Sequence, residues 1–521
     1  MSTVMKPING AESLISTLVA SGVDVAFTNP GTSEMHFVAA LGRVEGMRAI
    51  LCLFEGVVTG MADGYGRMKR APAATLLHLG PGLAYGLANL HNARRAATPI
   101  VNIVGDHATY HAQYDAPLTS DVIGFARPVS SWVHMSMSAK TVAADGARAV
   151  QAARVAPGQI ATLILPADTA WDEGSGAASA LPVAAAATVS PRAVDEAAQL
   201  LRNGKRTAIL LRGSVLEEAS LETAGRIKAQ SGARIMCDTI VPRLTRGAGV
   251  VEVERVPYFA EQIVDYFKDI EQLILVGAKP PVSFFAYPGK ASWCLPEGCK
   301  VHYLAHVHED GPGALDALAD ALRAPSEPVG RVDLRRPELP QGPLNAYTIG
   351  QVIGHFLPDN AIVVDEAATS ARGTLKFTAA ASRHDHMGLT GGSLGMGIPV
   401  ASGAAVACPD RKVVCLQGDG GAMYTVQALW TQARENLDVT TVIFNNRAYG
   451  ILRVELERVG AENPGPKSLS LLDLTNPELD WVSLGRGLGV ESSRATTAEE
   501  LADQFQSAMK GRGPRLIEAV M

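Results

Sequence analysis

The sequence carries little charge and no concentrated basic segment. Charged residues make up 19% of its 521 residues, and the formal net charge is −6. No run of lysine and arginine is dense enough to follow a nucleic-acid backbone or an anionic membrane surface. Nucleic acid and membrane are therefore poor candidates for partners of this protein.

Long hydrophobic runs and paired cysteines are also missing. No apolar run is long enough to span a bilayer, and the first residues, MSTVMKPING, lack the charged-then-apolar pattern of a signal peptide. The six cysteines are scattered and form neither a CxxC pair nor a cluster with histidine. These absences predict a soluble, cytoplasmic protein whose thiols are buried and reduced.

Two stretches interrupt the regular pattern of the chain and divide it into thirds. Residues 172–191 are rich in Ala, Ser and Gly, and residues 324–343 are rich in proline. Both compositions are typical of linkers, and 521 residues are too many for a single core. We therefore predict three domains, at residues 1–175, 190–325 and 343–521.

Within each third, short apolar runs alternate with segments of helical spacing. VDVAFTN in the first third, RTAILLRG in the second and RKVVCLQ in the last are nearly unbroken apolar runs. Such runs are typical of parallel strands that are buried on both faces. The alternation predicts the α/β fold class, with three doubly wound domains built on mostly parallel sheets.

Glycines and oxygen-bearing side chains follow two neighbouring strands of the last third. Gly418-Asp419-Gly420-Gly421 comes directly after RKVVCLQ, and Asn445-Asn446 closes the strand VTTVIF. The glycines allow the backbone to approach a phosphate, and the helix that follows offers unpaired N–H groups. Asp419 and Asn446 supply oxygens suited to a Mg²⁺ ion that bridges phosphates. The pattern predicts a phosphate site at the strand ends.

This order of motifs resembles the signature of the thiamine diphosphate-dependent enzymes, in which GDG is followed at helix length by NN. The layout in thirds is similar to that of decarboxylases and acetolactate-synthase-like enzymes of this family, and most similar to benzoylformate decarboxylase. In that family a pyrimidine-binding domain and a diphosphate-binding domain flank a middle domain. The resemblance implies thiamine diphosphate and Mg²⁺ as cofactors.

The resemblance also gives expected roles to residues of the last third. Asp419 and Asn446 would bind Mg²⁺ through their side chains and Ala448 through its carbonyl. Leu394, in GGSLGMG, corresponds to the aliphatic residue that holds the cofactor bent, although ordinary core packing is the alternative. The residues expected beside the phosphates are Gly418, Gly420, Gly421, Tyr449, Gly450, Thr369 and Ser370, the last two with a plain turn as the alternative.

Glu55 follows the apolar run at residues 49–54 and should lie at the end of a strand. A carboxyl group among hydrophobic neighbours is costly to ionise, and its pKa rises. An exposed glutamate at a helix start is the local alternative. The stretch from Glu55 to Arg67 resembles the family segment whose glutamate hydrogen-bonds the cofactor's aminopyrimidine. The resemblance therefore implies that Glu55 is a catalytic residue that positions a proton.

The substrate side is expected near the turn Asn29-Pro30-Gly31-Thr32. This turn matches one in benzoylformate decarboxylase, which implies that Thr32 faces a substrate carboxylate and that Asn29, Pro30 and Gly31 lie beside the cofactor. His78 occupies the position of a catalytic histidine of that enzyme and could relay protons, although a structural histidine is the alternative. The second histidine of that enzyme is missing, because residues 283–287 read SFFAY.

Three further polar residues receive no role from the sequence. His107 and His111 follow the strand PIVNIVG and could reach the site from behind. Glu455 follows the NN motif, where it could face a polar or cationic substrate tail or lie exposed on a helix. The middle third has one glycine in RTAILLRGSV, where a nucleotide-binding turn needs two or three, so FAD is not expected.

The expected function is a thiamine diphosphate- and Mg²⁺-dependent 2-oxo acid decarboxylase or carboligase. The partners would be a small 2-oxo acid and, for a ligase, an aldehyde acceptor. In the family each active site takes its glutamate and its metal site from different subunits, which implies a homodimer or homotetramer. The alternatives are an acetolactate-synthase-like, acyloin-forming ligase and a non-catalytic protein that binds the cofactor as a sensor or assembly partner. The sequence leaves the choice of 2-oxo acid open.

Overall fold

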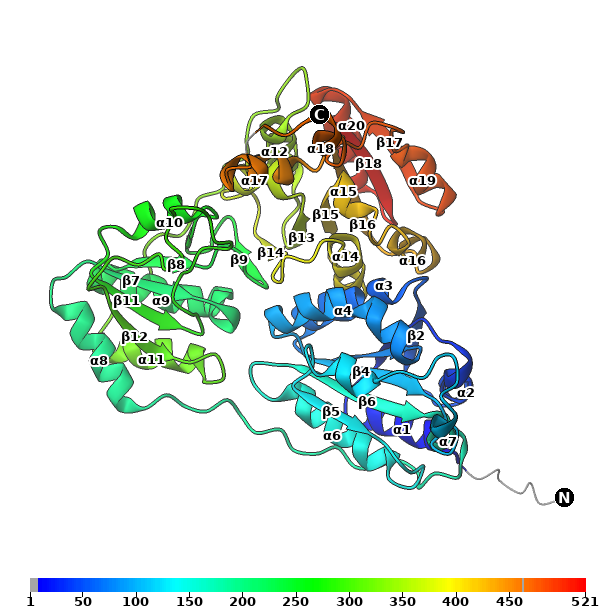
Figure 1. Ribbon diagram of the computed structural model, residues 1–521. Helices are drawn as coiled ribbons and strands as arrows, with labels where there is room; N and C mark the ends of the chain where they lie inside the picture. Colours follow the sequence, from blue (N-terminus) through cyan, green and yellow to red (C-terminus); the bar gives the residue numbers. More distant parts are fainter. Residues whose placement is uncertain (1–7, 462) are drawn as a thin grey trace.

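The computed structural model describes residues 8–461 and 463–521. The expectation drawn from the first seven residues therefore lies outside the described part. Within these ranges the strands form three sheets that follow one another along the chain (Figure 1). No helix in the described part is long and apolar enough to cross a membrane. The α/β fold class is confirmed.

The first sheet is parallel throughout and belongs to the first third of the chain. Its strands in spatial order are β2 (Arg48–Leu51), β1 (Val25–Thr28), β3 (Ala73–Leu77), β4 (Ile100–Asp106), β6 (Ile160–Pro166) and β5 (Trp132–Met135). Its helices are α1 (Gly10–Ala20), η1 (Thr32–Glu34), α2 (Met35–Leu41), α3 (Glu55–Lys69), α4 (Leu79–Ala96), η2 (Ala112–Tyr114), α5 (Val122–Ala126), α6 (Val142–Arg154) and α7 (Ala167–Trp171). The sequence reading had found β1 to β4 but not β5 or β6.

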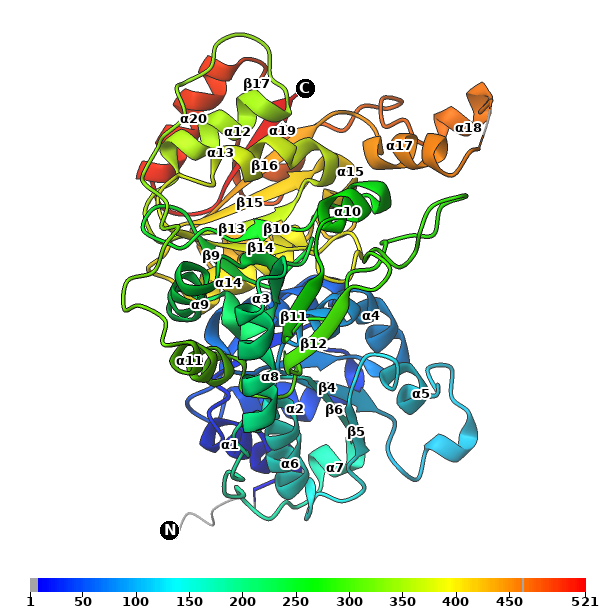
Figure 2. The same ribbon diagram turned by 90° about the vertical axis from the view of Figure 1, so that its left-hand side faces the viewer.

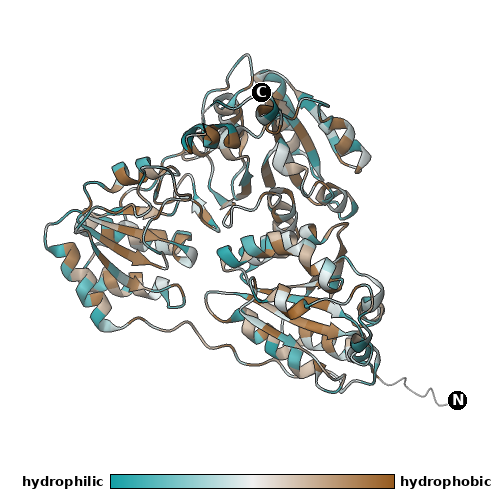
Figure 3. Cartoon of the chain, viewed as in Figure 1, coloured by the Kyte–Doolittle hydropathy of each residue, from teal (hydrophilic) through white to brown (hydrophobic). Residues whose placement is uncertain are grey.

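The second sheet is also parallel and belongs to the middle third. Its strands in spatial order are β10 (Glu254–Arg255), β8 (Arg234–Cys237), β7 (Thr207–Leu211), β11 (Gln272–Val276) and β12 (Lys300–Ala305). Its helices are α8 (Pro191–Arg202), η3 (Gly213–Leu216), α9 (Glu218–Ser231), α10 (Ala260–Phe267) and α11 (Gly311–Leu322). In Figure 3 the strands are mostly brown, as expected for runs that are buried on both faces.

The third sheet is parallel except at one edge. Its strands in spatial order are β17 (Glu491–Ala495), β18 (Arg515–Val520), β16 (Val439–Asn445), β15 (Val413–Gly418), β13 (Ala361–Glu366), β14 (His384–Gly388) and β9 (Leu244–Arg246). Its helices are α12 (Ala346–Phe356), η4 (Ala368–Ala371), α13 (Arg372–Phe377), α14 (Gly397–Ala407), α15 (Asp419–Ala422), α16 (Ala428–Arg434), α17 (Gly450–Arg458), α18 (Pro466–Ser470), α19 (Trp481–Gly487) and α20 (Ala498–Lys510).

Strand β9 comes from the middle third yet pairs antiparallel with β14 of the last third. The middle and last thirds are therefore joined through backbone hydrogen bonds as well as side chains. Residues 172–190, which link the first two sheets in Figure 1, form only isolated bridges among the described residues. We keep the domain limits 1–175, 190–325 and 343–521 as a proposal.

Helices α3 and α14 pack against each other between the first and third sheets (Figure 2). The contact is close enough to require glycine on both helices. A Cβ atom at Gly64 would lie 2.0 Å from the Val400 carbonyl oxygen, and one at Gly403 would lie 1.9 Å from that of Met61. Because α3 begins at Glu55, this packing fixes the position of that residue against the last third of the chain.

Candidate active site

The turn after β1 holds His78 at the carboxyl end of β3. His78 is the residue before α4, and its ring lies against Gly31 of the turn. A Cβ atom at Gly31 would lie 2.3 Å from the His78 ring, so only glycine permits this contact. The structure thus brings His78, which the sequence places on the substrate side, against Gly31, which was expected beside the cofactor.

Glu34 fixes His78, and the sequence reading missed it. Its Oε2 lies 2.8 Å from His78 Nδ1 and accepts a hydrogen bond of 2.7 Å from the Gly31 N–H. The side chain is 1% exposed, and burial raises the pKa of its carboxyl while His78 opposes that rise. Its position three residues after Gly31, where a helical turn starts, is the signal that could have revealed it.

The second carboxyl oxygen of Glu34, Oε1, is held in place by packing and not by a hydrogen bond from any described residue. Oε1 is buried and has no hydrogen-bond partner among the described residues. A Cβ atom at Gly105 would lie 1.6 Å from this oxygen, so the end of β4 accepts Glu34 only because that residue is glycine. A buried polar atom without a partner is costly, and such atoms are candidates for a role in function.

Glu55 lies at the start of α3 in the same neighbourhood. It is 8% exposed, and burial raises the pKa of its carboxyl. Three interactions lower this pKa in part: a hydrogen bond from the backbone N–H of Glu55 itself, one from the Asn29 side chain, and the charge of His78. A Cβ atom at Gly82 would lie 3.2 Å from Glu55 Oε1, so the first turn of α4 closes over the carboxyl.

Thr32, His107 and His111 lie near this cluster without joining it. Thr32 is exposed at the start of η1. His107 follows Asp106 at the end of β4, and its ring lies 5.4 Å from that of His111. Their roles at the site stay predictions.

The loop after β15 presents Asp419 to the loop after β16. Asp419 is 3% exposed and accepts hydrogen bonds from the N–H groups of Gly420 at 2.9 Å and Arg447 at 2.7 Å. It has no ion-pair partner within the described ranges, and burial raises the pKa of its carboxyl against these backbone bonds. A buried carboxylate held only by N–H groups is suited to receive a cation.

The two adjacent asparagines have different partners. Asn445 donates to buried Glu518 at 2.7 Å and so anchors the strand end. Asn446 accepts from the Ala448 N–H at 3.0 Å and donates to Ser370 Oγ at 3.2 Å. Its side chain therefore belongs to the loop cluster that contains Asp419.

Most of the remaining residues predicted for the phosphate end surround Asn446 and Asp419. A Cβ atom at Gly450 would lie 3.1 Å from Asn446 Nδ2 and 3.5 Å from Thr369 Oγ1. A Cβ atom at Gly420 would lie 2.4 Å from the Tyr449 ring. The backbone at Gly420 thus approaches the Tyr449 ring more closely than a larger residue would allow, and Gly450 leaves little room beside Asn446.

Glu366, at the end of β13, organises the segment that carries Leu394. Its two carboxylate oxygens accept hydrogen bonds from the N–H groups of Gly395, at 2.6 Å, and Gly397. Burial raises its pKa to about 7. A Cβ atom at Gly421 would lie 2.7 Å from Glu366 Oε1. Leu394, which is partly buried, is thus placed by Glu366, a residue that the sequence reading missed.

The two clusters are linked through the backbone. Asn89 of α4 donates to the carbonyl of Gly56, next to Glu55, at 2.8 Å, and to that of Gly395 at 3.2 Å. Thr431 of α16 donates to the Leu51 carbonyl at the end of β2. Within the described residues no hydrogen bond or ion pair directly joins Glu55 to Asp419.

The residues of the phosphate end fit a hydrated, oxygen-binding cation bridged to a diphosphate. No group of three or more His, Cys, Asp or Glu side chains in the described part is suited to a metal ion. A metal here would therefore bind one carboxylate, one amide and one carbonyl oxygen, from Asp419, Asn446 and Ala448. Mg²⁺ commonly binds few protein oxygens and takes the rest from phosphates and water.

Glu455 lies on α17 and faces the middle third rather than solvent. It is half-buried, and its Oε1 has no hydrogen-bond partner among the described residues. Burial raises the pKa of Tyr258 to about 12, and the negative charge of Glu455 contributes to this rise. Arg458, on the same helix, lies over the Phe259 ring at 3.9 Å and pairs with Glu261 at 2.8 Å. The alternative of an exposed helix glutamate is wrong.

Comparison with known proteins agrees with this geometry. Residues 8–125 match the N-terminal TPP binding domain of thiamine pyrophosphate enzymes, and residues 369–519 match the C-terminal TPP binding domain. A Mycobacterium tuberculosis protein with the provisional name acetolactate synthase large subunit IlvX is 53% identical, over 99% of both chains. Benzoylformate decarboxylase of Pseudomonas aeruginosa is 28% identical over 99% of this chain and 98% of that protein.

Solved structures share the whole fold at low sequence identity. The thiamine diphosphate-dependent 4-hydroxybenzoylformate decarboxylase of Rhodococcus jostii superposes with a TM-score of 0.83, at 23% identity over 99% of both chains. Benzoylformate decarboxylase from Polynucleobacter necessarius gives 0.84, at 22% identity over 98% of both chains. From these matches at both ends of the chain and over its whole length, we conclude that this protein belongs to the thiamine pyrophosphate enzyme family.

Proposed function

We propose that this protein is a thiamine diphosphate- and Mg²⁺-dependent 2-oxo acid decarboxylase or carboligase. The observation that carries the proposal is the group formed by Glu55, His78 and Glu34. It holds two buried carboxyls with raised pKa values around one histidine, at the carboxyl ends of parallel strands. Groups of this kind are suited to proton transfer at neutral pH.

Each residue of the group has a distinct task in this proposal. The bound cofactor supplies the electron sink for cleaving the bond between the carboxyl and carbonyl carbons of the substrate. Glu55 holds a proton at the pyrimidine nitrogen, and Asn29 orients its carboxyl. Glu34 holds His78 at Nδ1, which leaves Nε2 to exchange a proton with the substrate.

The residues of the last third would hold the diphosphate and its cation. Asp419, Asn446 and Ala448 would bind Mg²⁺, and the N–H groups around Gly420 and Tyr449 would face the phosphates. Leu394 would support the cofactor from below, in the position that Glu366 gives it. A second copy of the chain would complete each site, in a homodimer or homotetramer.

The direct test is carbon dioxide release from a panel of 2-oxo acids, with thiamine diphosphate and Mg²⁺ present. Pyruvate, branched-chain, aromatic and basic-tailed acids would be compared, each with and without an aldehyde. Release without aldehyde supports a decarboxylase, and release only with aldehyde supports a ligase. Cofactor binding without release from any acid supports the non-catalytic alternative.

An acyloin-forming ligase is the second candidate. Residues 283–287 contain no histidine, and Phe284 and Phe285 are 44% and 51% exposed there. Completing a decarboxylation requires a proton at the former carboxyl carbon, whereas joining that carbon to a carbonyl places the proton on the oxygen of the acceptor instead. A site with one histidine fewer therefore favours ligation. The relative named as an acetolactate synthase subunit points in the same direction.

A further inference from the structure

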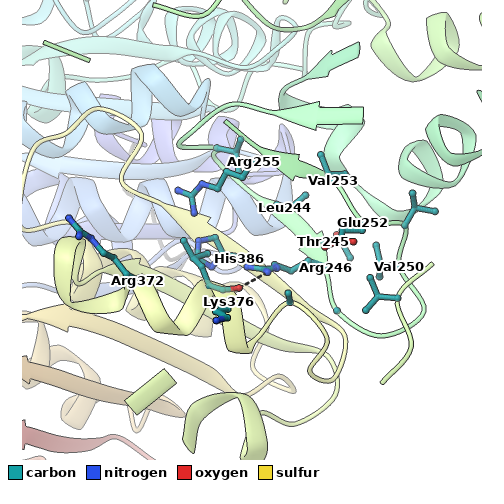
Figure 4. A pocket seen from close by; sticks show the side chains of 16 residues that line it. Leu244, Thr245, Arg246, Val250, Glu252, Val253, Arg255, Arg372, Lys376 and His386 are labelled. Atoms are coloured by element: carbon teal, nitrogen blue, oxygen red, sulfur yellow. Dashed lines mark hydrogen bonds between the residues drawn. The ribbon is translucent and has the colours of Figure 1, made fainter. Parts of the chain in front are cut away.

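A separate cavity of about 340 Å³ lies between the middle third and the last third. Strand β9 and residues 250–255 form one side, and α13 and β14 form the other (Figure 4). The cavity opens at the β9 edge of the third sheet, whereas Asp419 and Asn446 follow the central strands β15 and β16. Its volume is that of a small-molecule site.

The pairing of β9 with β14 sorts the polar side chains onto two faces. Thr245 is opposite Asp385, while Leu244 and Arg246 are opposite His386 and His384. Since side chains alternate along a strand, Thr245 and Asp385 share one face and Arg246 shares the other face with the histidines. The two faces therefore have different charges.

On the first face every cation has a carboxylate partner. Asp385 lies 3.0 Å from Arg243 and 2.8 Å from Arg411, and it accepts a hydrogen bond from Thr245 at 2.9 Å. These arginines hold the pKa of Asp385 below its usual value, although burial opposes them. This face is a closed network of neutralised charges.

The cavity face has the opposite balance. Four cations line it: Arg246, Arg255, Arg372 and Lys376. None of them forms an ion pair within the part of the chain that the structure describes. Among the described residues Arg246 donates only to the Leu375 carbonyl, at 2.8 Å, and burial lowers its pKa to about 10.

Buried nitrogen atoms in this region also have no hydrogen-bond partner among the described residues, and two of them belong to residues that line the cavity. His386 lines the cavity, is 4% exposed, and its Nε2 has no hydrogen bond to any described residue; the same holds for Arg255 Nη1. Burial, and then the charges of Arg255 and Arg246, hold the pKa of His386 well below its usual value. Figure 4 shows the side chains of Arg255 and Arg246 near that of His386. Such unpaired groups are costly unless a ligand pairs with them.

Acidic groups near the cavity do not balance these cations. Glu252 lines it but is exposed. Asp365, at the end of β13, interacts with Arg255 and Arg246, and burial raises its pKa to about 6, so it is mostly ionised at neutral pH. Two carboxylates thus lie near four cations, and the cavity has an excess of positive charge and planar guanidinium donors. These are the groups that bind multivalent oxyanions.

We propose that this cavity is a binding site for a small phosphate monoester. The phosphate group pairs with Arg246, Arg255 and His386, and Lys376 and Arg372 close over it from α13. The carbon part of the ligand lies against the apolar wall formed by Val241, Leu244 and Val250. Binding would strengthen the junction between β9 and β14, which joins the middle third to the last.

Inorganic phosphate is the smallest probe of this site. Its binding to the intact chain would be measured by calorimetry at constant ionic strength, with thiamine diphosphate and Mg²⁺ present so that the diphosphate site is filled. The double variant R372Q/K376Q removes two exposed cations of the cavity and leaves its buried groups intact. R192Q removes one exposed cation from α8 and serves as the control.

We expect phosphate to bind the wild type and R192Q alike, and to bind R372Q/K376Q at least tenfold more weakly. Phosphate should also raise the thermal midpoint of the wild type but not that of the double variant. Equal binding by all three proteins, no binding by the wild type, or tighter binding of malonate than of phosphate would overturn the proposal. The assay needs no turnover, so its outcome is independent of the proposed activity.

Discussion

The two halves of the candidate active site are built in different ways. In the N-terminal half, Glu34 meets His78 from 44 residues away and Asn29 approaches Glu55 across the sheet. In the C-terminal half, Asp419 is held by the N–H groups of its own loop and the next one. Under the proposed function, the first arrangement would handle protons among buried carboxyls, and the second would prepare a carboxylate to receive a cation. The difference would then separate catalysis from cofactor anchoring within one site.

The largest effect is expected from Glu55→Gln. The amide keeps the shape of the side chain but cannot exchange a proton, so the rate of carbon dioxide release should fall by about 10³-fold. The affinity for Mg²⁺ and the diphosphate group should stay near the wild-type value, because the diphosphate and its cation bind at the other half. Steady-state kinetics together with calorimetric titration of the cofactor would separate the two effects.

Wild-type turnover in Glu55→Gln would remove Glu55 from the proton-handling role. Loss of cofactor binding together with turnover would show that the two halves do not act separately. Glu457→Gln, at an exposed position on α17, is a matched control for the change of charge and should leave both quantities unchanged.

Asp419→Asn tests the other half. The substitution removes the only carboxylate of the expected metal site and should weaken Mg²⁺-dependent cofactor binding by about 10²-fold. Higher Mg²⁺ concentration should restore part of the activity, which it should not do for Glu55→Gln. If Mg²⁺ affinity is unchanged, the carboxylate does not bind the metal and the proposed ligand set is wrong.

The sequence predicts the second half better than the first for a physical reason. Asp419, Asn446 and their glycines lie in two loops that each follow an apolar strand, so a local pattern reveals them. Glu34 becomes meaningful only when Gly105 of a distant strand leaves room for it and His78 reaches it. Those contacts depend on the order of strands in the sheet, which no short stretch of sequence records.

The fold shows the same difference between features that a local sequence pattern reveals and features that depend on distant contacts. The unbroken apolar runs predicted the central strands in all three thirds, because burial on both faces leaves a strong signal. The pairing of β9 with β14 was not predicted, since a short edge strand with Thr and Arg resembles a loop. Glu366 closes an apolar strand as Glu55 does, and that pattern could have revealed it.

A smaller effect is expected from Glu34→Gln, which tests whether Glu34 positions His78 in the N-terminal half of the site. Glu34 positions His78 rather than contacting substrate, so the substitution should lower the turnover rate about tenfold, less than the loss of a proton-transfer group. The pH profile of the rate should change, because burial raises the pKa of the Glu34 carboxyl and glutamine cannot titrate. Rate profiles between about pH 5 and 9 would show this. A lower rate with an unchanged profile would indicate a purely structural role.

The last expected effect is on stability and not on rate, and it concerns Glu366, which breaks the simple contrast by placing a proton-binding carboxyl in the second half. Burial raises its pKa to about 7 from the ordinary 4.5, so the folded protein holds this proton more tightly than the unfolded chain. Its contribution to stability is therefore complete below pH 4.5 and is lost as the pH rises to about 7, by roughly 3 kcal/mol at most. Glu366→Gln cannot titrate, so its thermal midpoint relative to wild type should rise between pH 5 and pH 8, values set about this window. A midpoint difference that does not change with pH would mean that Glu366 is ionised throughout and that its hydrogen bonds to Gly395 and Gly397 outweigh its burial.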